Sequence, residues 1–115
     1  ASFGLVSARY NKSIGQIQED AGLHQRALAI MKEIEVIAHR KGIPLPPNII
    51  EQTFQKSSTF PYDTPTSLQL DIQSQKKNNE LELFAGAILH YGKELNIPVM
   101  ETEKIYNEIK ELYHL

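Results

Sequence analysis

The segment 23–41 constrains the fold more than any other, because its apolar residues recur at the spacing of an α-helix. These residues are Leu23, Ala27, Ile30, Ile34, Ile37 and Ala38. Side chains three and four positions apart share one face of a helix, so this face must be buried against other elements. Asp20 and Gly22 introduce the helix, and Gly42 suits the left-handed position after its last turn. A long amphipathic helix of this kind predicts a packed helical domain.

The other apolar segments have helical spacing too, and none shows the two-residue alternation of a strand. The stripe of Phe3, Val6 and Tyr10 is already under way at Ala1, so we expect this helix to start before the chain does. Further helices are predicted over residues 49–54, 65–72, 80–95 and 102–113. The sequence therefore predicts an all-α fold, a compact bundle of about six or seven helices that forms a single domain over residues 1–115.

Composition and charge argue against several classes of protein. The chain has 115 residues, of which 41% are hydrophobic and 23% charged, as in ordinary globular proteins. It contains no cysteine, no apolar run long enough to span a bilayer and no signal peptide, so we expect a cytoplasmic protein without a membrane partner. A net charge of −2 argues against a nucleic-acid partner. The four histidines are scattered, and none has the spacing of a metal site.

Polar residues that can carry chemistry gather in the stretch 64–98. Thr64 is a good N-cap and Pro65 suits the first helical position, so a helix is expected to begin at the proline. That helix places Ser67 and Asp71 one turn apart on one face. The opposite face is apolar.

A second helix is predicted to follow within the same stretch. Asn79 is its expected N-cap and Glu80 its first residue. The dipole and free N–H groups of a helix N-terminus favour a negative charge, so the Glu80 carboxylate should point along the connection toward Ser67. The helix also carries the small residues Ala85, Gly86, Ala87 and Gly92, which suggest that a neighbour crosses it closely.

Each of these residues has a simpler interpretation. Ser67 and Asp71 can be the solvated face of an amphipathic helix. Glu80 can be an ordinary first-turn residue that complements the helix dipole. Glu33 and Glu35, on the long helix, can be exposed charges, one of them paired with a nearby lysine or arginine.

The order of several short motifs resembles a known family. The runs SLQLD, NELEL and GAILHYGKELNIP follow one another, and MKEIEVIAHRKGIPLP precedes them. They are similar to the C-terminal domain of 2-dehydropantoate 2-reductase, or ketopantoate reductase, whose pattern is S-M-x-x-D, then E-I-D or E-L-E, then a helix ending in G-I-x-x-P. The spacing from Asp71 to Glu80 is one residue longer than in that pattern. The resemblance covers nearly the whole chain.

The resemblance implies a helical fold like the C-terminal domain of 6-phosphogluconate dehydrogenase, serving substrate binding and dimerisation. It also implies an N-terminal Rossmann domain as partner. Nothing in this chain matches the G-x-G-x-x-G turn of such a domain, so NADPH would serve the full-length enzyme and would not be bound by this chain alone. The family's catalytic lysine would fall just before Ala1.

Carried over residue by residue, the resemblance assigns roles within the site. Ser67 would bind the substrate carboxylate, and Glu80 would be the catalytic glutamate that works beside the lysine. Asp71 and Glu33 would be supporting residues. The reaction implied is the NADPH-dependent reduction of ketopantoate, a small 2-oxo acid, to pantoate in pantothenate and coenzyme A biosynthesis, with the isolated chain inactive.

Two alternatives stay open: a non-catalytic helical interaction or dimerisation module of the same fold, and a reductase of a related branched 2-oxo acid. A homodimer is also expected. Without a Rossmann domain, the apolar residues Phe3, Leu5 and Val6 would lose part of their cover, and exposed apolar patches promote self-association.

Overall fold

The computed structural model describes residues 2–74 and 80–114, and every regular element in this part of the chain is helical. The helices are α1 (Ser2–Tyr10), α2 (Ile14–Glu19), α3 (Ala21–Arg40), α4 (Ile49–Ser57), α5 (Ser67–Gln73), the π-helical turn η1 (Glu82–Gly86), α6 (Ala87–Leu95) and α7 (Met100–Leu112). The predicted all-α bundle is confirmed. None of the described helices combines the length and apolar character needed to cross a membrane.

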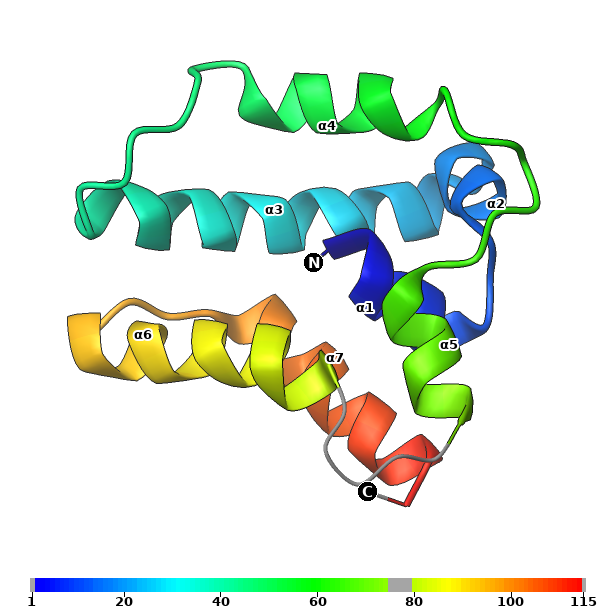
Figure 1. Ribbon diagram of the computed structural model, residues 1–115. Helices are drawn as coiled ribbons and strands as arrows, with labels where there is room; N and C mark the ends of the chain where they lie inside the picture. Colours follow the sequence, from blue (N-terminus) through cyan, green and yellow to red (C-terminus); the bar gives the residue numbers. More distant parts are fainter. Residues whose placement is uncertain (1, 75–79, 115) are drawn as a thin grey trace.

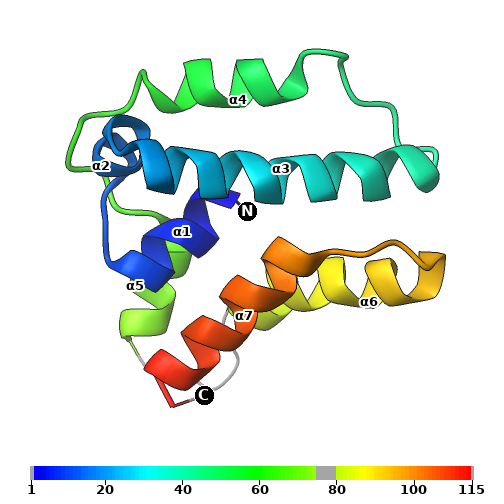
Figure 2. The same cartoon turned by 180° about the vertical axis from the view of Figure 1, so that it is seen from behind.

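Helix α3 runs through the middle of the molecule, with α4 along one side and α6 and α7 on the other (Figures 1 and 2). The predicted C-terminal end of α3 is confirmed, whereas the helix starts at Ala21, two residues before the expected Leu23. Asp20 is the N-cap, since its Oδ1 accepts the Leu23 N–H at 3.0 Å. Gly42 has a φ of +72°, the left-handed conformation that ends the helix without a Cβ clash.

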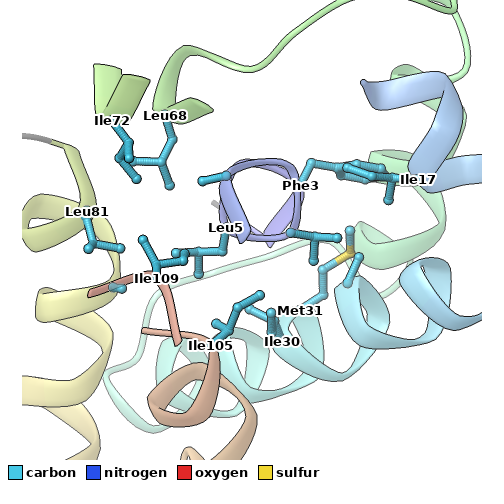
Figure 3. Packing of buried hydrophobic residues seen from close by; sticks show 14 of the residues in the cluster. Phe3, Leu5, Ile17, Ile30, Met31, Leu68, Ile72, Leu81, Ile105 and Ile109 are labelled. Atoms are coloured by element: carbon cyan, nitrogen blue, oxygen red, sulfur yellow. The ribbon is translucent and has the colours of Figure 1, made fainter. Parts of the chain in front are cut away.

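The core forms around α1, which packs against α3, α5 and α7. Figure 3 shows Leu5 of α1 surrounded by apolar side chains from these helices and from Leu81. Phe3 is 8% exposed, and Leu5 and Val6 are 0% exposed. The expectation that these three residues lack cover is therefore wrong, because neighbouring helices of this same chain bury them.

The start of α5 also differs from expectation. The helix begins at Ser67 and its N-cap is Thr66, whose hydroxyl accepts the Gln69 N–H at 3.1 Å. Thr64 does not cap, because its backbone is engaged elsewhere: its carbonyl accepts the Ile14 N–H at 2.9 Å. The connection before α5 is thereby tied to the first turn of α2.

The C-terminal end of α6 agrees with the sequence prediction, and the start of α7 differs from it. Asn96 adopts the expected left-handed conformation after α6, with a φ of 60°. Helix α7 begins at Met100, two residues before the predicted start near Thr102, since Glu33 accepts the backbone N–H groups of its first turn. The predicted N-cap Asn79 lies outside the described residues. The π-helical turn η1, which follows Glu80, was not predicted.

An ion-pair cluster joins three helices on one side of the core. Glu108 of α7 accepts from Arg9 of α1 at 2.6 Å and from Arg26 of α3 at 2.6 Å. Hydrogen bonding to Arg26, and then to Arg9, lowers the pKa of Glu108 to about 2. The hydrogen bond from Arg26 to Glu108, and then the one to Tyr10, raises the pKa of Arg26 above its usual value. The cluster holds α1, α3 and α7 in one register.

Glu108 should therefore make folding stability depend on acid pH. Its pKa lies below the unfolded value of 4.5, so the stabilisation is complete above that pH and is lost as pH falls toward about 2. Glu108→Gln should remove this dependence and cost on the order of 1–3 kcal/mol at pH 7, allowing for solvent screening. Urea unfolding of both proteins between pH 7 and pH 3 measures the effect. Glu111→Gln, on the exposed face of α7, is the control and should unfold like the parent chain.

Candidate active site at the junction of α5 and η1

The junction between α5 and the helical turn that starts at Glu80 brings three predicted site residues together. The Ser67 hydroxyl donates a hydrogen bond to Oε2 of Glu80 at 3.1 Å. The Glu80 backbone N–H donates to Oδ2 of Asp71 at 2.6 Å. The two ends thus face each other despite the longer connection between Asp71 and Glu80.

Helix α5 presents Ser67 and Asp71 outward because its other face is apolar. Leu68 and Ile72 are 2% and 1% exposed and pack into the core around α1. In a helix these positions lie about 100° around the axis from Ser67 and Asp71. Burial of the apolar pair therefore turns the polar pair toward Glu80.

The segment before α5 is held by a close approach to α2. The Gly15 N–H donates to the carbonyl of Tyr62 at 3.0 Å. A Cβ on Gly15 would lie 2.6 Å from that carbonyl oxygen and 2.4 Å from the Tyr62 ring, so only glycine fits. This contact fixes where the chain enters α5.

Glu80 is held from the other side by the turn that follows it. Leu81 is 1% exposed and anchors this segment in the core. One residue further on, Oε1 of Glu82 accepts from the Tyr106 hydroxyl of α7 at 2.5 Å. The turn η1 then replaces α-helical with π-helical hydrogen bonding, a feature that often lies beside functional sites.

The arrangement offers one hydroxyl donor and one carboxylate in partly solvated surroundings. Ser67 is exposed and Glu80 is half-buried. A serine hydroxyl can turn its single proton toward an anionic ligand, and a carboxylate can accept hydrogen bonds or orient a proton donor. The hydroxyl can therefore donate a hydrogen bond to a small ligand, and the carboxylate can accept one from it. They carry no redox function of their own.

Glu33 lies apart from this junction. Its carboxylate accepts the backbone N–H of Glu101 and of Thr102, both at 2.8 Å, and the Thr102 hydroxyl at 2.6 Å. It therefore caps the N-terminus of α7 from the side of α3. The interpretation of Glu33 as an exposed helix charge is wrong, since its carboxylate is bonded to the first turn of another helix.

The described residues offer no evident place for the cofactor that the resemblance implies. They contain no strand, and therefore no strand followed by a glycine-rich turn and a helix that could receive a dinucleotide pyrophosphate. Within the same residues, no three His, Cys, Asp or Glu side chains are grouped so as to hold a metal ion.

Comparison with known proteins identifies the family. The family model described as ketopantoate reductase PanE/ApbA C terminal matches residues 1–113. The chain belongs to this family. No curated protein sequence matches the chain significantly.

Two solved structures of ketopantoate reductases share the fold. A PanE/ApbA family enzyme from Ralstonia eutropha JMP134 has a TM-score of 0.84 at 21% identity, covering 96% of this chain and 36% of that one. A dimeric ketopantoate reductase from Staphylococcus aureus has a TM-score of 0.86 at 15% identity, covering 98% of this chain and 39% of that one. The chain thus spans well under half the length of either ketopantoate reductase.

The contact between Asp71 and the Glu80 backbone predicts a stability effect within this ketopantoate reductase domain. Asp71→Ala removes the acceptor of a helix N-terminal N–H and should destabilise the chain by about 1 kcal/mol. Asp71→Asn retains an acceptor oxygen and should cost less. Urea unfolding measures both variants. Asp63→Ala, in the exposed loop before α5, is the control, and an equal loss there would show that the effect is not specific to the cap.

Proposed function

We propose that this chain is the substrate-binding domain of an NADPH-dependent 2-dehydropantoate 2-reductase, and that it carries part of the active site. The observation that carries the proposal is the hydrogen bond of 3.1 Å between Ser67 and Glu80, formed across two helix ends in a chain of the ketopantoate reductase family. The reaction would reduce ketopantoate to pantoate in pantothenate and coenzyme A biosynthesis. We also propose a cytoplasmic location, in keeping with the lack of cysteine.

In this proposal the cofactor belongs to a Rossmann domain outside the chain, where it supplies hydride for the substrate carbonyl. The residues of this chain bind and orient the 2-oxo acid. Ser67 turns its hydroxyl proton from Glu80 toward the substrate carboxylate, a charge-assisted hydrogen bond. Glu80, released from that contact, orients the proton donor that neutralises the developing alkoxide.

Asp71 and Glu33 support this arrangement indirectly, through the backbone and through α7. Asp71 accepts the backbone N–H of Glu80 and so fixes where its side chain starts. Glu33 caps α7, which in turn holds the segment after Glu80 through the contact between Tyr106 and Glu82. Neither residue needs to touch substrate for this role.

A homodimer is part of the proposal, on grounds other than the N-terminal helix. Several apolar side chains are exposed near the C-terminal end of α3, namely Val36, Ile43 and Leu45, which are 47%, 48% and 39% exposed. Exposed apolar groups of this kind favour association. The ketopantoate reductase from Staphylococcus aureus that shares this fold is dimeric.

The substitutions Ser67→Ala and Glu80→Ala test the site in a full-length enzyme that contains this chain. Ser67→Ala removes a hydrogen bond to a charged carboxylate, worth about 1.5–3 kcal/mol, so kcat/KM should fall about ten- to a hundredfold. Glu80→Ala should reduce it further and alter the pH profile, because a charge beside the proton donor is lost. Steady-state kinetics and melting temperature are measured together.

Ser58→Ala and Glu94→Ala are the matched controls, since both side chains are exposed and far along the chain from the junction. They should leave kcat/KM within about twofold of the parent enzyme. If Ser67→Ala and Glu80→Ala lower only the melting temperature, the junction is a helix cap and a solvated face, and the non-catalytic module becomes the better account.

A second prediction concerns the cofactor. Because no described residues form a dinucleotide-binding turn, the isolated chain should bind NADPH no better than background. Isothermal titration calorimetry of the 115-residue chain with NADPH measures this. A dissociation constant of about 1–10 μM would contradict the assignment of the cofactor to another domain.

A further inference from the structure

We infer that Gln69 is a positioning residue of the candidate site: it locks α5 to the end of α1 and thereby places Ser67 and Asp71 for Glu80. The inference rests on the proposed function, which uses Ser67 and Glu80 but gives Gln69 no task. Gln69 lies between Ser67 and Asp71 on α5, yet it points toward α1 and is only 8% exposed. A buried amide needs hydrogen-bond partners, so its contacts indicate its role.

Gln69 uses both ends of its amide. Its Nε2 donates to Oδ1 of Asn11 at 2.7 Å, and its Oε1 accepts from the Ser7 hydroxyl at 2.7 Å. Ser7 is 0% exposed. A buried amide whose donor and acceptor are both satisfied specifies a single orientation, since rotation of the helix would leave polar atoms unpaired at a cost of about 1–3 kcal/mol each.

The backbone conformation of Asn11 favours this contact. It follows the last residue of α1 and has a φ of 54°, a left-handed conformation that asparagine tolerates better than most residues. Its Oδ1 also accepts from Nε2 of Gln73, one turn further along α5, at 2.6 Å. Two amides of α5 thus converge on one residue that ends α1.

The network tolerates either orientation of its amides. The Ser7 hydroxyl lies 2.6 Å from the Lys12 carbonyl as well as 2.7 Å from Gln69, and a hydroxyl has one proton to donate. If it donates to Lys12, the amides of Gln69, Asn11 and Gln73 turn over together and keep their mutual hydrogen bonds. The link between α1 and α5 is the same in both cases.

The apolar contacts of α5 cannot supply this orientation. Leu68 and Ile72 bury α5 against α1, but hydrophobic contact is not directional and permits small rotations and slides. The contact between Ser67 and Glu80 is directional and is lost with a shift of less than about 1 Å. A misplacement of about 1 Å at an active site can cost a hundredfold in rate. The hydrogen bonds of Gln69 are therefore needed to keep Ser67 in position for Glu80.

Gln69→Met tests the inference in a full-length enzyme that contains this chain. Methionine keeps the size and apolar stem but removes the amide, so kcat/KM for the 2-oxo acid should fall about five- to twentyfold through a higher KM. The KM for NADPH should stay within about twofold, because that site lies elsewhere. A residue of purely structural importance would lower the melting temperature and the active fraction while leaving both KM values in place.

Asn11 provides a second, exposed position in case Gln69→Met fails to fold. Asn11→Gly keeps the left-handed backbone but removes the acceptor, so it should raise the KM for the 2-oxo acid as Gln69→Met does. Asn11→Asp keeps the acceptor and should leave it within about twofold. Gln55→Met, on α4, is the control for loss of an exposed amide outside this network and should also stay within about twofold.

The outcomes separate this inference from the proposed function. If Ser67→Ala raises the KM for the 2-oxo acid and Gln69→Met and Asn11→Gly lower only the melting temperature, Gln69 is structural and the inference is overturned. If Ser67→Ala and Glu80→Ala change no kinetic constant, the proposed function itself is wrong. A crystal structure of the Gln69→Met chain gives a readout independent of activity. The Ser67 hydroxyl should then lie beyond about 3.5 Å from Glu80, and an unchanged distance would contradict the inference.

Discussion

Burial of α1 is the constraint on which the other helices depend. Leu5 and Val6 have no exposed surface, and a fully buried side chain of this kind contributes about 1.5–3 kcal/mol. Helices α3, α5 and α7 all pack against α1 and so share one core, and α3 and α7 also contact each other directly. Figure 3 shows how their apolar side chains converge on Leu5. Without α1, α5 would lose its main packing partner in the described part of the chain.

Polar contacts around this apolar centre decide how each helix is oriented. Glu33 fixes the first turn of α7 against α3, and Glu108 joins α7 to α1 and α3 through two arginines. Gln69 joins α5 to the end of α1. Hydrophobic burial favours contact without specifying an angle, whereas hydrogen bonds and ion pairs need defined geometry. Hydrophobic burial therefore assembles the bundle, and the hydrogen bonds and ion pairs align its helices.

The candidate site follows from that alignment. Ser67, in the first turn of α5, meets Glu80 immediately before Leu81 anchors the next helical segment in the core. The two groups are supplied by different helical segments, so the distance between Ser67 and Glu80 depends on how the helices of the bundle pack. The junction places a hydroxyl donor beside a carboxylate acceptor, in a chain of the ketopantoate reductase family.

Several features were predictable from the sequence because they depend on neighbours within one helical turn. The apolar stripe of α3, its Asp20 cap and the left-handed residues Gly42 and Asn96 are all local. The same holds for the shared face of Ser67 and Asp71. Periodicity and capping involve residues at most four positions apart, so they can be recognised without knowing the fold.

Only the tertiary structure decided the rest. Thr66 caps α5 in place of Thr64 because the Thr64 carbonyl is taken by Ile14, fifty positions earlier in the chain. Glu33 caps a helix that begins 67 positions later, and Gln69 pairs with a residue 58 positions away. Local patterns cannot choose among many possible distant partners for a carboxylate or an amide. The choice is made when burial of the apolar faces brings particular helix ends together, because only then does each polar group have a defined neighbour to satisfy it.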